Sequence, residues 1–356
     1  MDYKTAGVDI DKGDLASKFA YQNAKKTFFT RKNKIGQPVT LEEGFSGVLD
    51  FGNFFLLQND DGVGTKSEIA EKCQKFDTLG QDLVAMVADD AVCVGAETVS
   101  ITNTFDVPKV DPEIIKKCTE SLSLSCIAEK IVVPGGEIAE LGDAVNKMIW
   151  NATAVAVVKK EKFITGQKIS VNDDIIGLKG NVLRSNGITL ARKICEKNFG
   201  NDWHKKIWKD NTTWGEILLT PSKIFHRLLL DNILGDFEQK SFFEIKGIVH
   251  ITGGGIPGNI FRIVPPNLGV NFFDLHSPHD AVKNLKKLGN IDDEECYRTW
   301  HCGTAMMLIC DPKFSDKICQ KLNKADSTIE AKKVGKITDE KKIEMQSQFS
   351  EKILII

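Results

Sequence analysis

Short apolar runs alternate with helical patterns along most of this chain, and no other feature restricts its fold as strongly. Apolar runs typical of strands lie at 54–58, 98–104, 131–133, 152–158, 174–178, 247–252 and 305–310. Helical patterns lie at about 77–94, 112–128 and 186–198, and further helices are expected after Pro221 and Pro278. Strands that alternate with helices indicate an α/β fold.

A polar, turn-rich segment at 159–174 interrupts the alternation. Domain boundaries fall in segments of this kind. The chain of 356 residues is also long enough for two domains of roughly 150 residues each. We therefore expect an N-terminal α/β domain over 1–167 and a C-terminal α/β domain over 168–345.

The charge balance and the cysteine pattern exclude several classes of protein. Lysine and arginine number 47 and aspartate and glutamate number 49, so the basic excess typical of nucleic-acid binding is missing. No apolar run approaches the roughly 18 residues of a membrane span, and the N-terminus lacks the apolar core of a signal peptide. The nine cysteines contain no C-x-x-C pair. We expect a cytoplasmic protein with reduced cysteines that binds neither nucleic acid nor membrane.

The first candidate site is the segment Asn59-Asp60-Asp61-Gly62-Val63-Gly64-Thr65-Lys66, which follows an apolar run and is expected to end that strand. Gly62 and Gly64 give the backbone the freedom to bring amides close to a phosphate. Asp61 can bind a hard cation through oxygen, and Thr65 and Lys66 can contact phosphate oxygens. The spacing is not that of a P-loop. A polar β-turn without function is the alternative.

The second candidate site lies on the helix at 77–94. At about 100° per residue, Asp90 projects between Met86 and Val87 on the apolar face, whereas Asp82 and Asp89 lie to its side and are expected to be solvated. A carboxylate on an apolar face is costly unless it is paired or bound to a metal. Asp61 and Asp90 would form a magnesium pair, and a structural salt bridge is the alternative.

Two glycine-rich turns complete the set of candidates. Gly135-Gly136 places Glu137 at the end of the strand expected at 131–133, where it could bind metal or act as a base, and Glu140 could begin a helix. Gly253-Gly254-Gly255 follows another apolar run and precedes a helix start, which favours anion binding. His226, His276 and His279 have no recognisable partners and are expected at the surface or at helix caps.

In this order and spacing, the motifs resemble the phosphoribosylformylglycinamidine cyclo-ligase family, also called AIR synthetase. The resemblance runs from about residue 3 to 310. The matching segments are Tyr3–Asp11, Asp61–Lys66, Asp82–Met86 with Asp90, Gly95–Glu97, Gly135–Glu137 with Ala139-Glu140, Ser185–Gly187, Leu219–Pro221, His250–Gly255 with Asn259, and Tyr297–Thr299 with Cys302-Gly303.

The resemblance implies two α/β domains, with the N-terminal domains paired across a homodimer. It implies that ATP and Mg²⁺, with K⁺ possible, drive ring closure of formylglycinamidine ribonucleotide to aminoimidazole ribonucleotide. The implied catalytic residues are Asp61, Lys66, Asp90 and Glu137, of which Asp61, Asp90 and Glu137 would bind metal. The implied nucleotide or phosphate contacts are Gly62, Gly64, Thr65, Ser185, Asn186, Gly253, Gly254, Gly255 and Asn259.

The chain departs from the family pattern at several positions. The glycine-rich stretch before the first motif is thin around Gly44. Ile138 replaces a threonine, Asn103 an acid, Arg184 a histidine and Ala305 a glycine. These departures leave two alternatives open. One is a superfamily relative that uses ATP on another small substrate, such as thiamine monophosphate or a formylated amide, and the other is a non-catalytic nucleotide-binding homologue.

Overall fold

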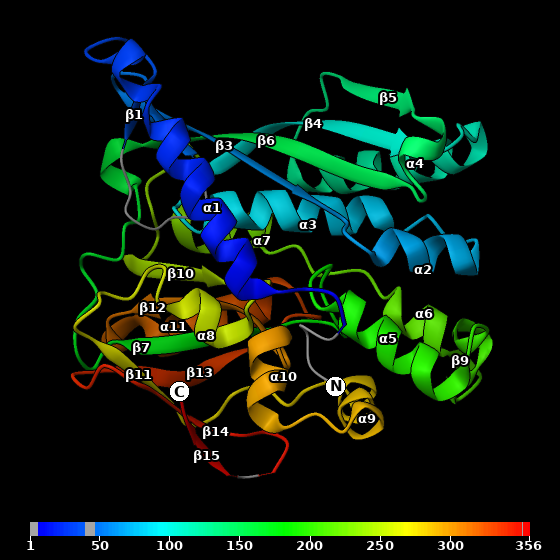
Figure 1. The fold of residues 1–356 in the computed structure, drawn as a ribbon. Coiled ribbons are helices and arrows are strands. Elements are labelled where there is room, and N and C mark those ends of the chain that lie inside the picture. The colour runs from blue at the N-terminus through cyan, green and yellow to red at the C-terminus, as the bar shows by residue number, and fades with distance from the viewer. Residues whose placement is uncertain (1–5, 40–46, 351) are drawn as a thin grey trace.

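The computed structural model describes residues 6–39, 47–350 and 352–356. Within them the chain forms two large sheets with helices packed on them (Figure 1). The N-terminal sheet forms the upper layer of Figure 1, with α3 and α4 beneath it, and the C-terminal sheet lies below these helices. The two α/β domains expected from the alternation are confirmed. The motif residues Tyr3–Thr5 and the stretch around Gly44 lie outside the described residues.

The N-terminal sheet has the strand order β1-β2-β3-β6-β4-β5 within the described residues. Every neighbouring pair is antiparallel except β4 and β5, which are parallel. The strands are β1 (Gln37–Val39), β2 (Gly47–Asp50), β3 (Phe54–Gly62), β4 (Glu97–Val107), β5 (Gly136–Glu140) and β6 (Ile149–Lys159).

The C-terminal sheet has the strand order β10-β12-β7-β13-β11-β14-β15, and only its β11–β14 pair is parallel. It continues beyond the domain end at 345 that the sequence indicated. The strands are β7 (Asp174–Lys179), β10 (Ile245–His250), β11 (Gly269–Phe272), β12 (Thr304–Cys310), β13 (Ala331–Thr338), β14 (Ile343–Gln346) and β15 (Ile353–Ile355). A separate hairpin pairs β8 (Ile207–Lys209) with β9 (Thr212–Thr213).

The helices cover the sheets and connect their strands. The longer ones are α1 (Ile10–Lys25), α3 (Leu79–Val92), α4 (Pro112–Glu129), α5 (Ile188–Phe199), α9 (Asp280–Gly289) and α11 (Pro312–Ala325). The shorter ones are α2 (Lys66–Cys73), α6 (Trp214–Leu218), α7 (His226–Leu229), α8 (Gly255–Ile260) and α10 (Asp293–Thr299), and a π-helical turn at Leu230–Leu234 continues α7.

Helix α3 is the central element of the molecule because both domains pack on it. It contacts β3, β4 and β6 of the N-terminal sheet, and α7 and β10 of the C-terminal domain. Its apolar side chains are fully buried on all sides, as expected for a helix that is covered all round. At Gly80 the backbone of α4 comes so close that an added Cβ would lie 2.1 Å from the Leu122 nitrogen. The core is therefore continuous across the two domains.

The structure corrects two of the expected elements. Strand β3 continues through Asn59–Gly62, which were expected to form a turn, because these residues pair with β6 from Asn151 to Ala154. The apolar run at 131–133 forms one isolated bridge, between Val132 and Ser100, instead of a strand.

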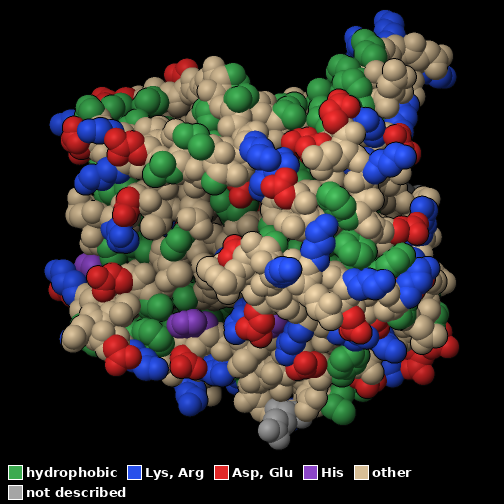
Figure 2. Space-filling view, turned by 180° about the vertical axis from the view of Figure 1, so that it is seen from behind, with side chains coloured by type: hydrophobic (Ala, Val, Ile, Leu, Met, Phe, Trp, Pro, Cys, Tyr) green, Lys and Arg blue, Asp and Glu red, His purple; other side chains and the backbone are tan. Residues whose placement is uncertain are grey.

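No helix within the described ranges is both long and apolar enough to cross a membrane. Acidic and basic side chains are interspersed over the face shown in Figure 2. On this face the distribution agrees with the balanced composition.

Candidate active site at the domain junction

The motif segments meet where the N-terminal end of β12 and the C-terminal ends of β7 and β10 share one edge of the C-terminal sheet. His250 at the end of β10 pairs with Met306 of β12, and Leu178 near the end of β7 pairs with the same residue. The loops that leave this edge carry Ser185 and Gly253. Helix α3, which belongs to the N-terminal domain, packs on β10. The junction thus brings both halves of the sequence to one place.

Asp61 and Asp90 form an acidic pair at this junction. Asp61 ends β3 and its carboxylate accepts a 2.7 Å hydrogen bond from the Gly62 amide, while Asp90 lies on the last turn of α3. Burial raises the pKa of Asp90 to about 7, and burial together with the charge of Asp90 raises the pKa of Asp61 to about 7. Two buried carboxyl groups that repel each other will bind either protons or a cation, and carboxylate oxygens are preferred Mg²⁺ ligands. The residues present therefore fit a magnesium ion.

His250 holds Asp90 from the C-terminal domain. Its Nδ1 lies 2.6 Å from a carboxylate oxygen of Asp90, and the imidazole is fully buried. Burial, and then the charge of Arg184, lower the pKa of His250 well below its usual value, so the ring is neutral at pH 7. A neutral ring that carries its proton on Nδ1 donates it to the Asp90 carboxylate. The pair gives Asp90 a fixed orientation.

The segment Asp61–Lys66, here called the DGVGTK turn, contacts the loop after β7 and the start of α5. The Thr65 hydroxyl lies 2.9 Å from the Thr189 hydroxyl. Gly64 has a φ of +54°, and a Cβ added there would lie 3.7 Å from the Ser185 carbonyl oxygen. A Cβ added to Gly253 would lie 3.6 Å from the Asn186 side-chain nitrogen. The structure therefore brings together three of the four segments that the sequence singled out.

The glycine-rich turn after β10 is shaped by Asn259. The Asn259 amide donates to the carbonyls of Gly253 at 3.0 Å and Gly255 at 2.7 Å. Gly254 and Gly255 have φ values of +86° and +61°, which side chains rarely adopt. Asn259 thus organises the turn from within, and the partly buried Gly253 lies next to the Asn186 side chain.

Several buried polar atoms near the junction have no hydrogen-bond partner among the described residues. They are Arg184 Nε, Ser185 Oγ, Asn186 Oδ1, His250 Nε2 and His301 Nε2. Buried polar groups are nearly always satisfied in native proteins. This concentration of unsatisfied atoms is typical of a site that binds a polar ligand or ordered water.

Lys66 does not reach the acidic pair in this structure. Its ammonium group is fully buried, forms a 2.8 Å ion pair with Asp82 and donates to the Thr220 carbonyl, also at 2.8 Å. The prediction that Asp82 and Asp89 are solvated is wrong, because both are completely buried. Asp82 is bound by Lys66 and by Ser222 of the C-terminal domain, and Asp89 by groups of the C-terminal domain alone, which covers the side of α3 that was expected to face water.

Glu137 lies apart from the acidic pair. It is exposed on β5 and pairs with Thr104. Strands β4 and β6 separate β5 from β3, a distance of about 14 Å at ~4.8 Å per strand. The prediction that Glu140 begins a helix is wrong, since Glu140 ends β5 and accepts a 2.7 Å hydrogen bond from the Val110 amide.

The departures from the family pattern have different surroundings. Asn103 accepts a 2.9 Å hydrogen bond from the Trp150 indole, and Ile138 is exposed on β5. Ala305 lies on β12. Its Cβ packs against Gly180, next to the loop that carries Arg184. Arg184 is buried and forms a 2.6 Å ion pair with Asp89. Arg184 is therefore the departure that enters the junction itself.

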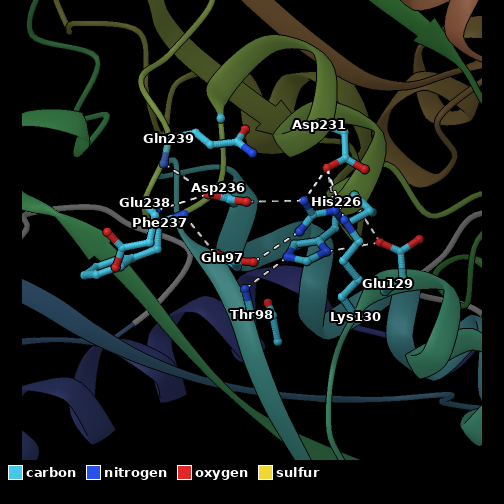
Figure 3. Close-up of polar contacts among 12 residues, drawn as sticks. Glu97, Thr98, Glu129, Lys130, His226, Asp231, Asp236, Phe237, Glu238 and Gln239 are labelled. Carbon is cyan, nitrogen blue, oxygen red and sulfur yellow. Dashed lines mark hydrogen bonds and ion pairs between the residues drawn. The ribbon is translucent and has the colours of Figure 1, made fainter.

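A second polar network, missed from the sequence, joins the domains beside the junction (Figure 3). His226 is fully buried, accepts a 3.0 Å hydrogen bond from the Thr98 amide and contacts Glu129 at 3.1 Å. Arg227 pairs with Glu97, Asp231 and Asp236. The expectation that His226 and His276 lie at the surface is wrong, because both are buried, whereas His279 does cap α9.

A cavity of about 350 Å³ lies elsewhere, between the interdomain linker at 161–168 and the segment at 241–246. None of the predicted site residues lines it. Its ammonium groups already have partners, since Lys168 pairs with Glu244 and Lys246 with Asp173. The cavity is therefore separate from the candidate site.

Comparison with known proteins agrees with this geometry. The family model of the AIR synthase related protein N-terminal domain matches residues 46–158, and that of the C-terminal domain matches residues 170–348. The phosphoribosylformylglycinamidine cyclo-ligase of Pyrococcus horikoshii is 34% identical over 347 residues, which cover 96% of this chain and 98% of that protein. The protein of the same name from Methanocaldococcus jannaschii is 33% identical over 339 residues, which cover 95% and 92%.

Solved structures show the same fold at lower identity. PurL of Thermotoga maritima complexed with FGAR aligns with a TM-score of 0.61 and 15% identity, over 93% of this chain and 49% of that one. The hydrogenase maturation protein HypE in complex with ATP aligns with a TM-score of 0.59 and 14% identity, over 84% of each chain. Because both domain models match in order and the cyclo-ligases align over nearly the whole length, this chain belongs to the phosphoribosylformylglycinamidine cyclo-ligase family.

Proposed function

We propose that this chain uses ATP and Mg²⁺ to close formylglycinamidine ribonucleotide to aminoimidazole ribonucleotide, a step of purine synthesis. The observation that carries the proposal is the partly buried Asp61–Asp90 pair at the domain junction of a cyclo-ligase family member. Proteins of this fold have been solved with ATP and with FGAR bound, which supports a nucleotide and a phosphorylated small molecule as ligands.

The amide oxygen of the substrate is a poor leaving group, and its phosphorylation by ATP turns it into a good one. The amide oxygen of the substrate attacks the terminal phosphorus of ATP, so an O–P bond forms and ADP leaves. A nitrogen of the same substrate then attacks the carbon that carries the phosphorylated oxygen. The new C–N bond closes the ring, the C–O bond breaks, and inorganic phosphate and a proton are released. Holding the nitrogen close to the carbon supplies much of the rate enhancement.

The residues of the junction have distinct parts in this scheme. Asp61 and Asp90 would hold Mg²⁺, which when bound neutralises the triphosphate. His250 keeps Asp90 in place, and the backbone of Gly62, Gly64 and Gly253 would lie against phosphate oxygens. Ser185, Asn186 and Thr65 supply further polar contacts. Lys66 contributes indirectly. It is the first residue of α2, and its ion pair with Asp82 fixes the start of α2 against α3.

The test mixes the purified chain with formylglycinamidine ribonucleotide, ATP and Mg²⁺, with and without K⁺, and follows ADP and aminoimidazole ribonucleotide together. We expect equal amounts of both products. Asp61→Asn and Asp90→Asn should abolish both. Asp77→Asn is the matched control, because Asp77 is exposed, pairs only with Lys75 within the described residues and should leave turnover unchanged.

The other outcomes separate the alternatives. ADP without the imidazole product would indicate a superfamily relative that acts on another substrate. Neither product, from a folded protein that binds ATP, would indicate a non-catalytic homologue.

We also propose that the chain forms a homodimer through its N-terminal domain. Large apolar side chains are exposed around β5 and the adjoining strands, namely Val99, Val132, Val133, Ile138, Leu141 and Ile149. Exposed apolar patches of this kind mark interaction sites. A second copy that covered this patch would also bury Glu137. Sedimentation should show a dimer for the native chain and a monomer for Ile138→Asp with Ile149→Asp, and a native monomer would contradict the proposal.

A further inference from the structure

Two adjacent carboxylates on the last turn of α3 have opposite surroundings. Asp89 is completely buried and accepts three hydrogen bonds, from Arg184 Nη2 at 2.6 Å, the Phe225 amide at 2.8 Å and the His226 amide at 2.9 Å. The side chain of Asp90 is 15% exposed and meets His250. One carboxylate is therefore fixed inside the protein, while its neighbour faces the junction.

All three donors to Asp89 belong to the C-terminal domain. Arg184 comes from the loop after β7, and the two amides lie at the start of α7, so Asp89 caps a helix of the other domain. Arg184 is itself 2% exposed, and its guanidinium lies over the Phe225 ring at 5.6 Å. Arg184, Asp89 and the start of α7 form one rigid contact, which we call the α3 clamp.

The α3 clamp determines where Asp90 points. Consecutive side chains on a helix are separated by about 100° around its axis, so a rotation of the helix turn that redirects Asp90 also moves Asp89. A rotation of the last turn of α3 would break the ion pair with Arg184 and two amide hydrogen bonds at once. With the clamp closed, Asp90 lies against His250 across the junction and interacts electrostatically with Asp61 of its own domain.

We propose that Arg184 is a positioning residue for the metal site: it acts through Asp89 to fix the orientation of Asp90 relative to Asp61. The inference rests on the proposed function, because it assigns a role to the Asp61–Asp90 pair. Arg184 stands where the family pattern has a histidine, so the α3 clamp involves a departure from that pattern.

A direct role of Arg184 is the competing interpretation. Its Nε is buried and has no hydrogen-bond partner among the described residues, so this atom could contact a ligand. The two interpretations differ in how Arg184 depends on Asp89. A residue that acts only through Asp89 becomes dispensable when Asp89 no longer needs a charged partner, whereas a residue that contacts the ligand does not.

The experiment measures Mn²⁺ binding to the full chain by electron paramagnetic resonance, without substrate. Asp90→Asn should abolish binding, and Arg184→Gln should weaken it tenfold or more. The double variant Asp89→Asn with Arg184→Gln should return to within threefold of the native affinity, because two neutral amides can still pair. Arg227→Gln is the matched control, since it removes another buried arginine of the domain interface.

The possible results are distinct. Native affinity in Arg184→Gln, or an equal loss in Arg227→Gln, would overturn the inference. A loss in Arg184→Gln that the double variant does not restore would assign Arg184 a direct contact and would also overturn it. If Arg184→Gln fails to fold, the double variant decides alone: affinity within threefold of the native value supports a role through Asp89, and a tenfold loss overturns the inference. Absence of Mn²⁺ binding by the native chain would instead refute the proposed metal site.

Discussion

Substitution of Lys66 should test whether a motif lysine acts on phosphate or on the fold. In this structure its ammonium group is fully buried between Asp82 and the Thr220 carbonyl, with both distances at 2.8 Å. Lys66→Met keeps most of the side-chain volume and removes the charge. Asp82 then remains buried, with hydrogen bonds from the Ser222 amide and hydroxyl as its remaining partners among the described residues.

The expected loss of stability is large. Breaking a buried ion pair by removing one partner costs about 3–5 kcal/mol, because an uncompensated charge stays behind. For a domain of this size each kcal/mol changes Tm by about 2–4 °C, so Lys66→Met should lower Tm by about 6–20 °C. Adding Asp82→Asn should restore at least half of the loss, since the asparagine oxygen can still accept from Ser222 without a buried charge.

Thermal unfolding by circular dichroism measures the stability, and calorimetric titration with ATP, well below the transition, measures binding to the folded protein. We expect a lower Tm together with an ATP Kd within about threefold of the native value. A native Tm combined with a more than tenfold weaker ATP affinity would refute the reasoning. That result would mean that the ammonium group reaches a phosphate in a conformation other than this one.

Further substitutions test other parts of the junction. Because the pKa of Asp61 is raised from 3.8 to about 7, the metal-free folded state binds more protons than the unfolded state between these pH values. The contribution of Asp61 to stability should therefore fall as pH rises through this window. The difference in Tm between pH 5 and pH 8 should shrink in Asp61→Asn. Gly255→Ala should prevent folding, since its Cβ would lie 1.9 Å from the Tyr297 carbonyl oxygen, whereas Gly253→Ala has room and should fold normally but lose ligand affinity in the ATP titration. His226→Ala should cost about 1–3 kcal/mol in urea unfolding, because Glu129 and the Thr98 amide lose their partner, and an unchanged midpoint would contradict this.

Sequence periodicity identified the acids of α3 but reversed their burial. The helical pattern at 77–94 put Asp90 on the apolar face, whereas in α3 (Leu79–Val92) Asp90 is partly exposed and Asp82 and Asp89 are completely buried. Asp82 and Asp89 were expected in water because one side of an amphipathic helix usually faces solvent. The helix contains no basic residue, so its buried carboxylates had to find cationic partners elsewhere in the chain. That composition was the available signal, although it could not name Lys66 or Arg184.

Local motifs also could not fix the position of Glu137. Two glycines before an acid are compatible with a loop over a sheet and equally with an edge strand. Which of these forms depends on the pairing with β4, a contact between residues far apart in sequence. The same limit applies to His226, whose partners Thr98 and Glu129 come from the other domain. Residue types and their order indicated the family and the acidic pair, whereas the network between the domains required tertiary structure.

The contacts that stabilise the domain interface are also the contacts that arrange the site. The N-terminal domain supplies Asp61 and Asp90, and the C-terminal domain supplies His250 and the loops that carry Ser185 and Gly253. Neither domain alone contains the full set. Since α3 is covered from both sides, separating the domains would expose its apolar surface and release Asp89 and Asp90 together. Loss of the interface should therefore remove metal affinity and stability in one step, which makes the two-domain junction, and neither domain by itself, the functional unit of this chain.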